Sequence, residues 1–188
     1  GQLGEDAFTS DEMHETMELC VGCKGCKREC PTGVDMSRMK TEFLYHYNRR
    51  HGLSLRDKLV AYLPRYAPWA SKFPWLANLR DAIPGLAKLS EAIAGLSAKR
   101  TLPNWRGDAF DVRTQHAGPT DGTPVVILAD TFNTYFEPEN LIAATRVLAS
   151  AGYRVEFAKA PKGERPLCCG RTFLAAGLVD EARAEATR

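Results

Sequence analysis

The sequence lacks long apolar runs and has no marked excess of either charge. No uninterrupted apolar stretch reaches the roughly 18 residues that a membrane-spanning helix needs, so we expect no transmembrane segment. The 25 basic and 23 acidic residues nearly balance, which gives no electrostatic support for nucleic-acid binding. No charged-then-apolar leader opens the chain. We expect a cytoplasmic location, and peripheral contact with the inner face of the membrane stays open.

The six cysteines lie in two short segments, which favours a reducing compartment and metal chemistry over a disulfide scaffold. The first segment holds Cys20, Cys23, Cys26 and Cys30, followed at once by Pro31. This is the bacterial ferredoxin spacing for a [4Fe–4S] cluster. Three thiolates at steps of three can wrap around one corner of a cubane. The spacing therefore predicts that these four cysteines bind iron and that the chain carries electrons.

Two glycines and several neighbouring side chains fit this prediction. Gly22 and Gly25 let the backbone approach inorganic sulfide closely and donate N–H bonds to it. Cations beside the cysteines would stabilise the more negative reduced cluster and raise its reduction potential, although ordinary solvated charge is an equal alternative. These cations are Lys24, Lys27 and Arg28. The four histidines show no ligand spacing and are interpreted as surface or helix residues: His14, His46, His51 and His116.

Two alternatives to iron stay open. A zinc site with four cysteines usually separates two C-x-x-C pairs by a dozen or more residues, and this segment has no such gap. The chain could still be a zinc- or thiol-stabilised binding module without redox function.

In two-cluster proteins the cysteine before the proline ligates the other cluster, so Cys30 could serve a partner cluster. No second cysteine run supplies the remaining ligands, and we expect this chain to be a fragment of a longer protein.

The N-terminal part reads as a helical cluster-binding unit over residues 1–53. Thr9 and Glu12 form a capping box for a short helix that leads into the cysteines. Asp35 can cap a longer helix that runs to about His51 and ends at Gly52. One face of that helix is apolar, and its two methionines lie near enough in sequence to shield a cluster. The apolar residues are Met36, Met39, Phe43, Leu44 and Tyr47.

The rest of the chain predicts an α+β fold overall. Prolines divide residues 54–118 into short helices, whose apolar faces we expect to pack on a neighbouring domain rather than on a membrane. In residues 119–188, a partial α/β domain, the apolar run 125–129 is typical of a buried parallel strand. Helix 138–151 and strand 153–157 complete a βαβ unit with a right-handed crossover.

A second cysteine site, Cys168-Cys169-Gly170, follows the second strand. The βαβ order places its loop at the carboxyl end of the sheet, near Asp130. Adjacent cysteines do not form an unstrained disulfide with each other, so we interpret Cys168 and Cys169 as cofactor ligands or a redox pair. A catalytic dithiol and a plain turn with two small buried side chains are the alternatives. Arg171 could lower a thiol pKa or bind an anionic group.

These motifs carry a family resemblance that covers nearly the whole chain. The CCG triplet resembles the cysteine-rich domain of heterodisulfide reductases and of the Fe–S subunits of glycolate oxidase and anaerobic glycerol-3-phosphate dehydrogenase. The segments 19–36, 40–44, 130–133 and 165–171 together are similar to large bacterial fusions of an FAD-linked D-2-hydroxyacid dehydrogenase with an Fe–S half. The sequence departs from the fuller CCG pattern at Asp130 and at Arg171 to Phe173, where further cysteines are expected.

The resemblance implies an oxidoreductase whose FAD domain lies upstream of this chain. That domain would oxidise D-lactate, glycolate or D-2-hydroxyglutarate, and the clusters would relay flavin electrons to a quinone or another acceptor. No catalytic residue is expected here, because the substrate site would lie in the FAD half. The fragment alone is therefore expected to be inactive.

Overall fold

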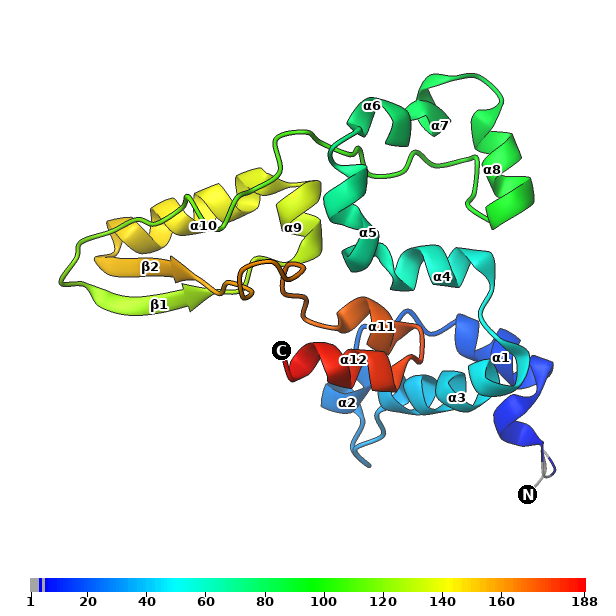
Figure 1. The fold of residues 1–188 in the computed structure, drawn as a ribbon. Coiled ribbons are helices and arrows are strands. Elements are labelled where there is room, and N and C mark those ends of the chain that lie inside the picture. Colours follow the sequence, from blue (N-terminus) through cyan, green and yellow to red (C-terminus); the bar gives the residue numbers. More distant parts are fainter. Residues whose placement is uncertain (1–3, 5) are drawn as a thin grey trace. The chain divides into compact units, whose positions relative to one another are not determined.

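The computed structural model describes residue 4 and residues 6–188. Packing divides the chain into two compact units. Unit 1 combines the chain up to Ala61 with residues 170–187, and unit 2 contains residues 62–169 and Arg188. Many helices and a two-stranded sheet give the α+β class that the sequence predicts (Figure 1). Within the described residues, no helix has the length and apolar character needed to cross a bilayer.

Unit 1 is built around a long helix, α3, whose two ends match the prediction. The Asp35 side chain accepts a hydrogen bond from the Arg38 backbone N–H at 3.0 Å, and Gly52 ends the helix with a φ of +78°. The described helices of this unit are η1 (Ala7–Thr9), α1 (Asp11–Glu18), α2 (Gly25–Glu29), α3 (Met36–His51), α4 (Leu55–Ala61), α11 (Arg171–Ala175) and α12 (Val179–Ala186).

The predicted capping box at the start of α1 is wrong by one residue. Ser10, not Thr9, is the N-cap, and its hydroxyl accepts a hydrogen bond from the Met13 backbone N–H at 3.3 Å. Thr9 instead closes the 3₁₀ turn η1, where its N–H and its hydroxyl both donate to the Asp6 carbonyl. Because this turn occupies Thr9, the next residue becomes the cap.

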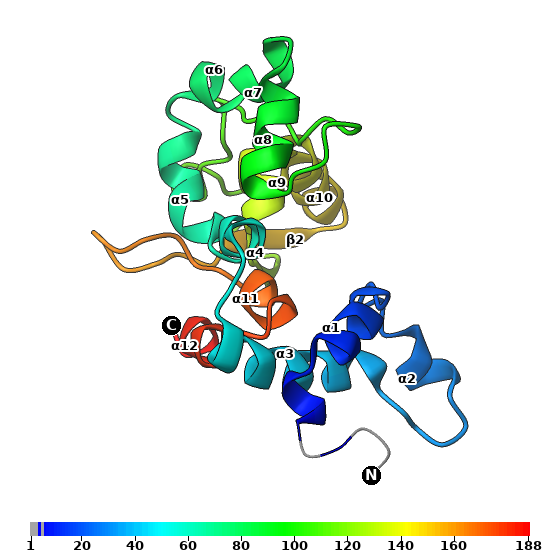
Figure 2. The same ribbon diagram turned by 90° about the vertical axis from the view of Figure 1, so that its right-hand side faces the viewer.

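The C-terminal helices α11 and α12 lie beside α3, far from it in sequence (Figure 2). Phe43 of α3 and Phe173 of α11 are both fully buried. The Asn48 amide donates to the Ala176 carbonyl at 2.8 Å, and Gly177 packs directly on the backbone of α3 at Leu44. The return of the chain therefore completes the core of the N-terminal helical unit.

Unit 2 begins with the short helices that the prolines predict: α5 (Leu63–Ala70), α6 (Pro74–Ala77), α7 (Leu79–Ala82) and α8 (Leu86–Ala94). Pro64 and Pro74 lie in the first turn of α5 and α6, where a missing N–H is harmless. Pro68 is the exception, because it lies inside α5. Trp69 and Trp75 are each 67% exposed, so the packing of these apolar faces on a neighbouring domain stays a prediction.

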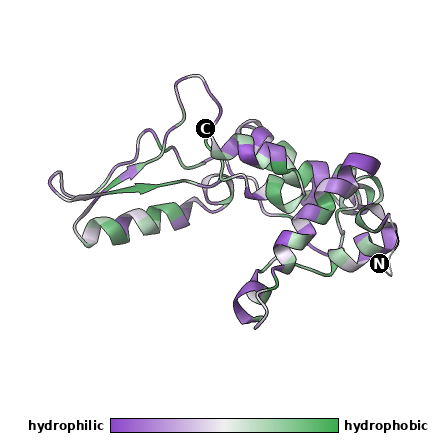
Figure 3. Ribbon diagram, turned by 90° about the horizontal axis from the view of Figure 1, so that it is seen from below, coloured by the Kyte–Doolittle hydropathy of each residue, from purple (hydrophilic) through white to green (hydrophobic). Residues whose placement is uncertain are grey.

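The predicted strand–helix–strand order is confirmed in unit 2. Strands β1 (Thr123–Ile127) and β2 (Tyr153–Phe157) pair in parallel, with Thr123 opposite Tyr153 and Ile127 opposite Phe157. The connection contains α9 (Thr131–Tyr135) and α10 (Pro138–Ser150), and α10 packs on β2. Both hydrophobic and hydrophilic residues occur along α10 (Figure 3), and its buried residues, Pro138, Leu141 and Thr145, follow the spacing of one helix face, as an amphipathic helix on a sheet requires.

The predicted burial of the first strand is wrong. β1 begins and ends two residues earlier than the apolar run suggests, and Val126 is 64% exposed. The core of unit 2 gathers on the α10 side of the sheet, around Phe110, Leu141, Val155 and Phe157. Since the side chains of a strand alternate between faces, Val126 points away from that core. Ile142 on α10 is likewise exposed.

The three sequence segments, 1–53, 54–118 and 119–188, do not map one to one onto the two units. Helices α11 and α12 of the last segment pack with the first segment in unit 1, whereas the sheet belongs to unit 2. The division into three domains stays a prediction.

Candidate functional site

The four cysteines of the first motif lie in unit 1, on the connection between α1 and α3. The Cys20 backbone N–H donates to the Met17 carbonyl at 3.1 Å, so this cysteine directly follows the last turn of α1. Cys20 is half-buried and Cys23 is exposed. Leu19 and Val21 on either side of Cys20 are 83% and 86% exposed. The first half of the motif is thus an open loop that presents its thiols at the surface.

The second half of the motif folds as the short helix α2. Cys26 lies on this helix, and Cys30 caps its end by donating its N–H to the Cys26 carbonyl at 2.8 Å. Lys24 precedes the helix with a φ of +62°, and Gly22 has a φ of +66°. Gly22 therefore supplies backbone freedom as predicted. At the second turn of the loop, the left-handed conformation falls on Lys24 rather than on Gly25.

Two of the four sulfurs already have hydrogen-bond partners nearby. The Met36 backbone N–H, at the first residue of α3, lies 3.2 Å from Cys26 Sγ. Cys30 Sγ lies 3.1 Å from Thr32 Oγ1. Hydrogen bonds from the Thr32 hydroxyl, and then from the Val34 and Thr32 backbone N–H groups, lower the pKa of the Cys30 thiol. This surrounding favours a thiolate, the form of cysteine that binds metals.

The donor set fits an iron–sulfur cluster by its chemistry. Four thiols within one short segment, with N–H groups directed at sulfur, are what a cubane needs from its protein. In residues 4 and 6–188, however, no three Cys, His, Asp or Glu side chains converge as ligands of a single metal ion. The thiols are separate, and the structure places Cys20, Cys23, Cys26 and Cys30 on one connection without bringing them into a closed site.

The predicted neighbours of the cysteines occupy different places. Lys27 lies 3.9 Å from Asp35, the cap of α3, and Arg28 is exposed on α2. Met36 is half-buried next to Cys26, whereas Met39 is 50% exposed. Met39 lines a separate, largely apolar hollow of about 660 Å³ together with Met13, Met17 and Phe43, among others.

Three of the four histidines contact side chains other than the cysteines, and the fourth is exposed. His14 and His51 each stack on the Tyr47 ring, with centroids 4.3 Å and 4.4 Å away. His46 pairs with Glu42 at 3.2 Å. His116 is exposed in the loop that precedes β1.

A hollow of about 290 Å³ lies against the first half of the cysteine loop, inside unit 1. Cys20 and Lys24 line it from the loop, Ser37 and Lys40 line it from α3, and Arg171 lines it from α11. Sequence reasoning assigns no role at the first motif to Lys40 or Arg171. Ser37, Lys40 and Thr41 have the i, i+3, i+4 spacing of one helix face, but only the folded chain shows that α11 meets this face.

The second motif crosses the boundary between the two units. Cys168 is buried and Cys169 is exposed, and both belong to unit 2. Gly170 and Arg171 belong to unit 1. Gly170 has a φ of +72°, and a Cβ there would lie 3.0 Å from the Ala182 carbonyl oxygen. The glycine of the triplet is therefore required by the backbone turn that leads into α11.

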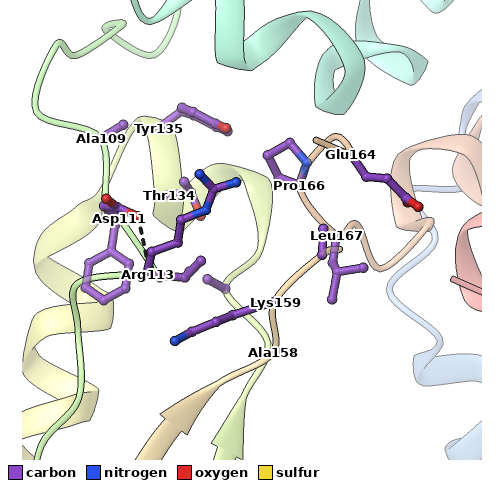
Figure 4. Close-up of a pocket in the computed structure, with 14 residues that line it drawn as sticks. Ala109, Asp111, Arg113, Thr134, Tyr135, Ala158, Lys159, Glu164, Pro166 and Leu167 are labelled. Carbon is purple, nitrogen blue, oxygen red and sulfur yellow. Dashed lines mark hydrogen bonds between the residues drawn. The ribbon is translucent and has the colours of Figure 1, made fainter. Parts of the chain in front are cut away.

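The residues before the two cysteines lie at the carboxyl end of the sheet, as predicted. Pro166 and Leu167 line a hollow of about 260 Å³ together with Ala129, which follows β1, and Ala158, which follows β2 (Figure 4). Charged and polar side chains surround this hollow, including Arg113, Lys159 and Glu164 in Figure 4. Crevices at the carboxyl ends of parallel strands are where open α/β folds commonly bind ligands.

Comparison with known proteins relates the chain to 2-hydroxyacid dehydrogenases. It is 39% identical over 71 residues to a protein of Escherichia coli named D-2-hydroxyglutarate dehydrogenase. The matched segment covers 38% of this chain and 7% of that protein. A protein of Pseudomonas putida with the same name is 28% identical over 177 residues, which covers 87% of this chain and 17% of that protein. The chain thus spans less than a fifth of the length of these relatives. No protein-family model and no solved structure matches it.

Proposed function

We propose that this chain is the electron-relay part of an FAD-linked 2-hydroxyacid dehydrogenase. The observation that carries the proposal is the ferredoxin-type spacing of Cys20, Cys23, Cys26 and Cys30 on one connection, in a chain similar to D-2-hydroxyglutarate dehydrogenases. Two further features support it. The Met36 N–H is directed at Cys26 Sγ, and hydrogen bonds favour a thiolate at Cys30.

Within this proposal each residue has a defined task. Cys20, Cys23 and Cys26 hold one [4Fe–4S] cluster, and Cys30 is either its fourth ligand or a ligand of a partner cluster. A bound cluster supplies one-electron transfer without acid or base catalysis. The Met36 N–H donates to a ligand sulfur, which stabilises negative charge there. Cys168 and Cys169 are proposed as further cofactor ligands, with Cys169 as the accessible one.

The proposal places the chemistry on the substrate outside this chain. An upstream FAD domain of the same polypeptide would oxidise D-2-hydroxyglutarate, D-lactate or glycolate and pass its electrons to the clusters. A quinone or another acceptor would then receive them, at the cytoplasm or at the inner face of the membrane. The isolated chain would bind iron but turn over no substrate.

Anaerobic purification, with assays of iron, sulfide and zinc and a visible spectrum before and after dithionite, tests the proposal. A brown protein with about four irons that bleaches on reduction is the expected result. Cys23→Ser should lose this iron because it removes a proposed ligand, and it should leave the fold intact because Cys23 is exposed. Cys169→Ser tests the second motif separately: an unchanged iron content would show that Cys169 is not an iron ligand.

Two results would contradict the relay proposal. Stoichiometric zinc without iron would favour the binding-module alternative. A colourless wild-type protein free of both metals, with no iron regained on anaerobic reconstitution with iron and sulfide, would show that this chain does not hold a cluster.

A further inference from the structure

Two cations from different helices donate to the backbone of the loop that carries the first two cysteines. Lys40 Nζ, from α3, lies 2.6 Å from the Cys20 carbonyl oxygen. Arg171 Nη2, from α11, lies 3.5 Å from the Gly22 carbonyl oxygen. The two carbonyls are two residues apart, and both precede Cys23. Helices distant in sequence therefore hold the same short segment of the cysteine loop.

The hollow around these contacts is electropositive. Lys24, Lys40 and Arg171 line it, and none of the three lies within 4.0 Å of a carboxylate among the described residues. The acidic side chain that lines the hollow, Glu18, is already paired with Arg56 at 2.9 Å. The three cations that line the hollow beside Cys20 therefore outnumber its one acidic side chain.

We propose that Lys40 and Arg171 are positioning residues that clamp the backbone of the Cys20–Cys23 segment of the cysteine loop against α3 and α11. This inference rests on the proposed function and deepens it. An ammonium and a guanidinium bonded to two alternate carbonyls restrict the backbone that carries the thiols. When the cluster is bound, the same two charges favour its more negative, reduced form. The arginine that follows the CCG triplet therefore acts on the first cysteine motif.

The clamp is tested first on the protein without metal, so that its outcome does not depend on cluster binding. Lys40→Met and Arg171→Met keep much of each side-chain stem but remove the charge and the donor. We expect amide hydrogen exchange in residues 20–24 to become at least roughly threefold faster in each variant. Arg183→Met is the matched control, because Arg183 is an exposed cation of α12 in the same unit. Equal exchange in all three variants and wild type would overturn the clamp.

The electrostatic part is tested on the cluster-loaded protein by potentiometric titration followed by EPR. Each variant should lower the reduction potential, with a threefold to tenfold loss in the reduction equilibrium, where tenfold corresponds to about 59 mV for one electron. Lys40→Arg should restore the wild-type potential, whereas Arg183→Met should not change it. Unchanged potentials in Lys40→Met and Arg171→Met would overturn this part. Faster loop exchange in the two variants, together with a wild type that binds no iron, would support the clamp and refute the relay proposal.

Discussion

Gly177 packs against the backbone of α3, and its replacement by alanine should selectively destabilise unit 1. The residue has a φ of +74°, and an added Cβ would lie 2.5 Å from Leu44 Cβ, 2.7 Å from the Leu44 carbonyl carbon and 2.8 Å from the Tyr45 nitrogen. Two of these atoms belong to the helix backbone, which cannot rotate away. The left-handed conformation costs about 1–2 kcal/mol and the overpacking about 1–3 kcal/mol, so we expect a loss of about 2–5 kcal/mol.

Gly33→Ala provides the matched control for this prediction. Gly33 has a similar φ of +71° in the same unit, but no atom lies within 4 Å of the position that an added Cβ would take. It should therefore lose only the conformational contribution, about 1–2 kcal/mol. Urea unfolding followed by far-UV circular dichroism measures both losses. Equal losses for Gly177→Ala and Gly33→Ala would refute the argument that close packing on α3 decides the cost.

The tryptophans make the location of the effect measurable. Trp69, Trp75 and Trp105 all lie in unit 2, so tryptophan fluorescence reports on that unit alone. Gly177→Ala should shift the circular dichroism transition more than the fluorescence transition. It should also speed amide exchange at the loop of Gly22, because α11, which carries Arg171, depends on the same turn for its place on α3.

Two further predictions concern unit 2. Leu141→Ala should cost about 2–5 kcal/mol, measured by urea unfolding with tryptophan fluorescence, because Leu141 is only 5% exposed. Ile142→Ala on the exposed side of α10 should cost much less, and equal costs would contradict the assigned core. Hydrogen bonds from Arg106 lower the pKa values of Asp108 and Glu139 below their ordinary 3.8 and 4.5. Their stabilising effect is therefore present above these values and is lost as the pH falls through the folded-state pKa values. The difference in Tm between wild type and Arg106→Gln should shrink as the pH falls from about 5 to about 2 at low salt, and a constant difference would refute this linkage.

Local signals in the sequence predict the helices that they control. Asp35 and Gly52 give the two ends of α3 because a cap and a stop act through hydrogen bonds and φ angles within a few residues. The start of α1 shows the limit of this reasoning. Thr9 and Ser10 are both competent caps, and the preceding 3₁₀ turn decides between them.

Burial and long-range contacts cannot be predicted in the same way. An apolar run indicates a strand but does not say which of its faces is covered, so the prediction of a buried Val126 fails because the core lies on the other side of the sheet. The spacing of the cysteines indicates the chemistry of the site. It cannot indicate that Lys40 and Arg171 both donate to backbone carbonyls of the cysteine loop, because the Arg171 contact depends on α11 packing beside α3.

The CCG triplet combines two functions that mutation of the whole motif would confuse. Its cysteines belong to unit 2, where Cys168 is buried and Cys169 is exposed. Its glycine makes the turn into α11 and admits α12 at Ala182, which sets the position of Arg171 at the cysteine loop. Replacing Gly170 would therefore displace Arg171 even if neither cysteine binds a cofactor. A loss of iron assigns a ligand in this motif only when Cys168 or Cys169 is changed alone and the exchange rate of residues 20–24 stays at its wild-type value.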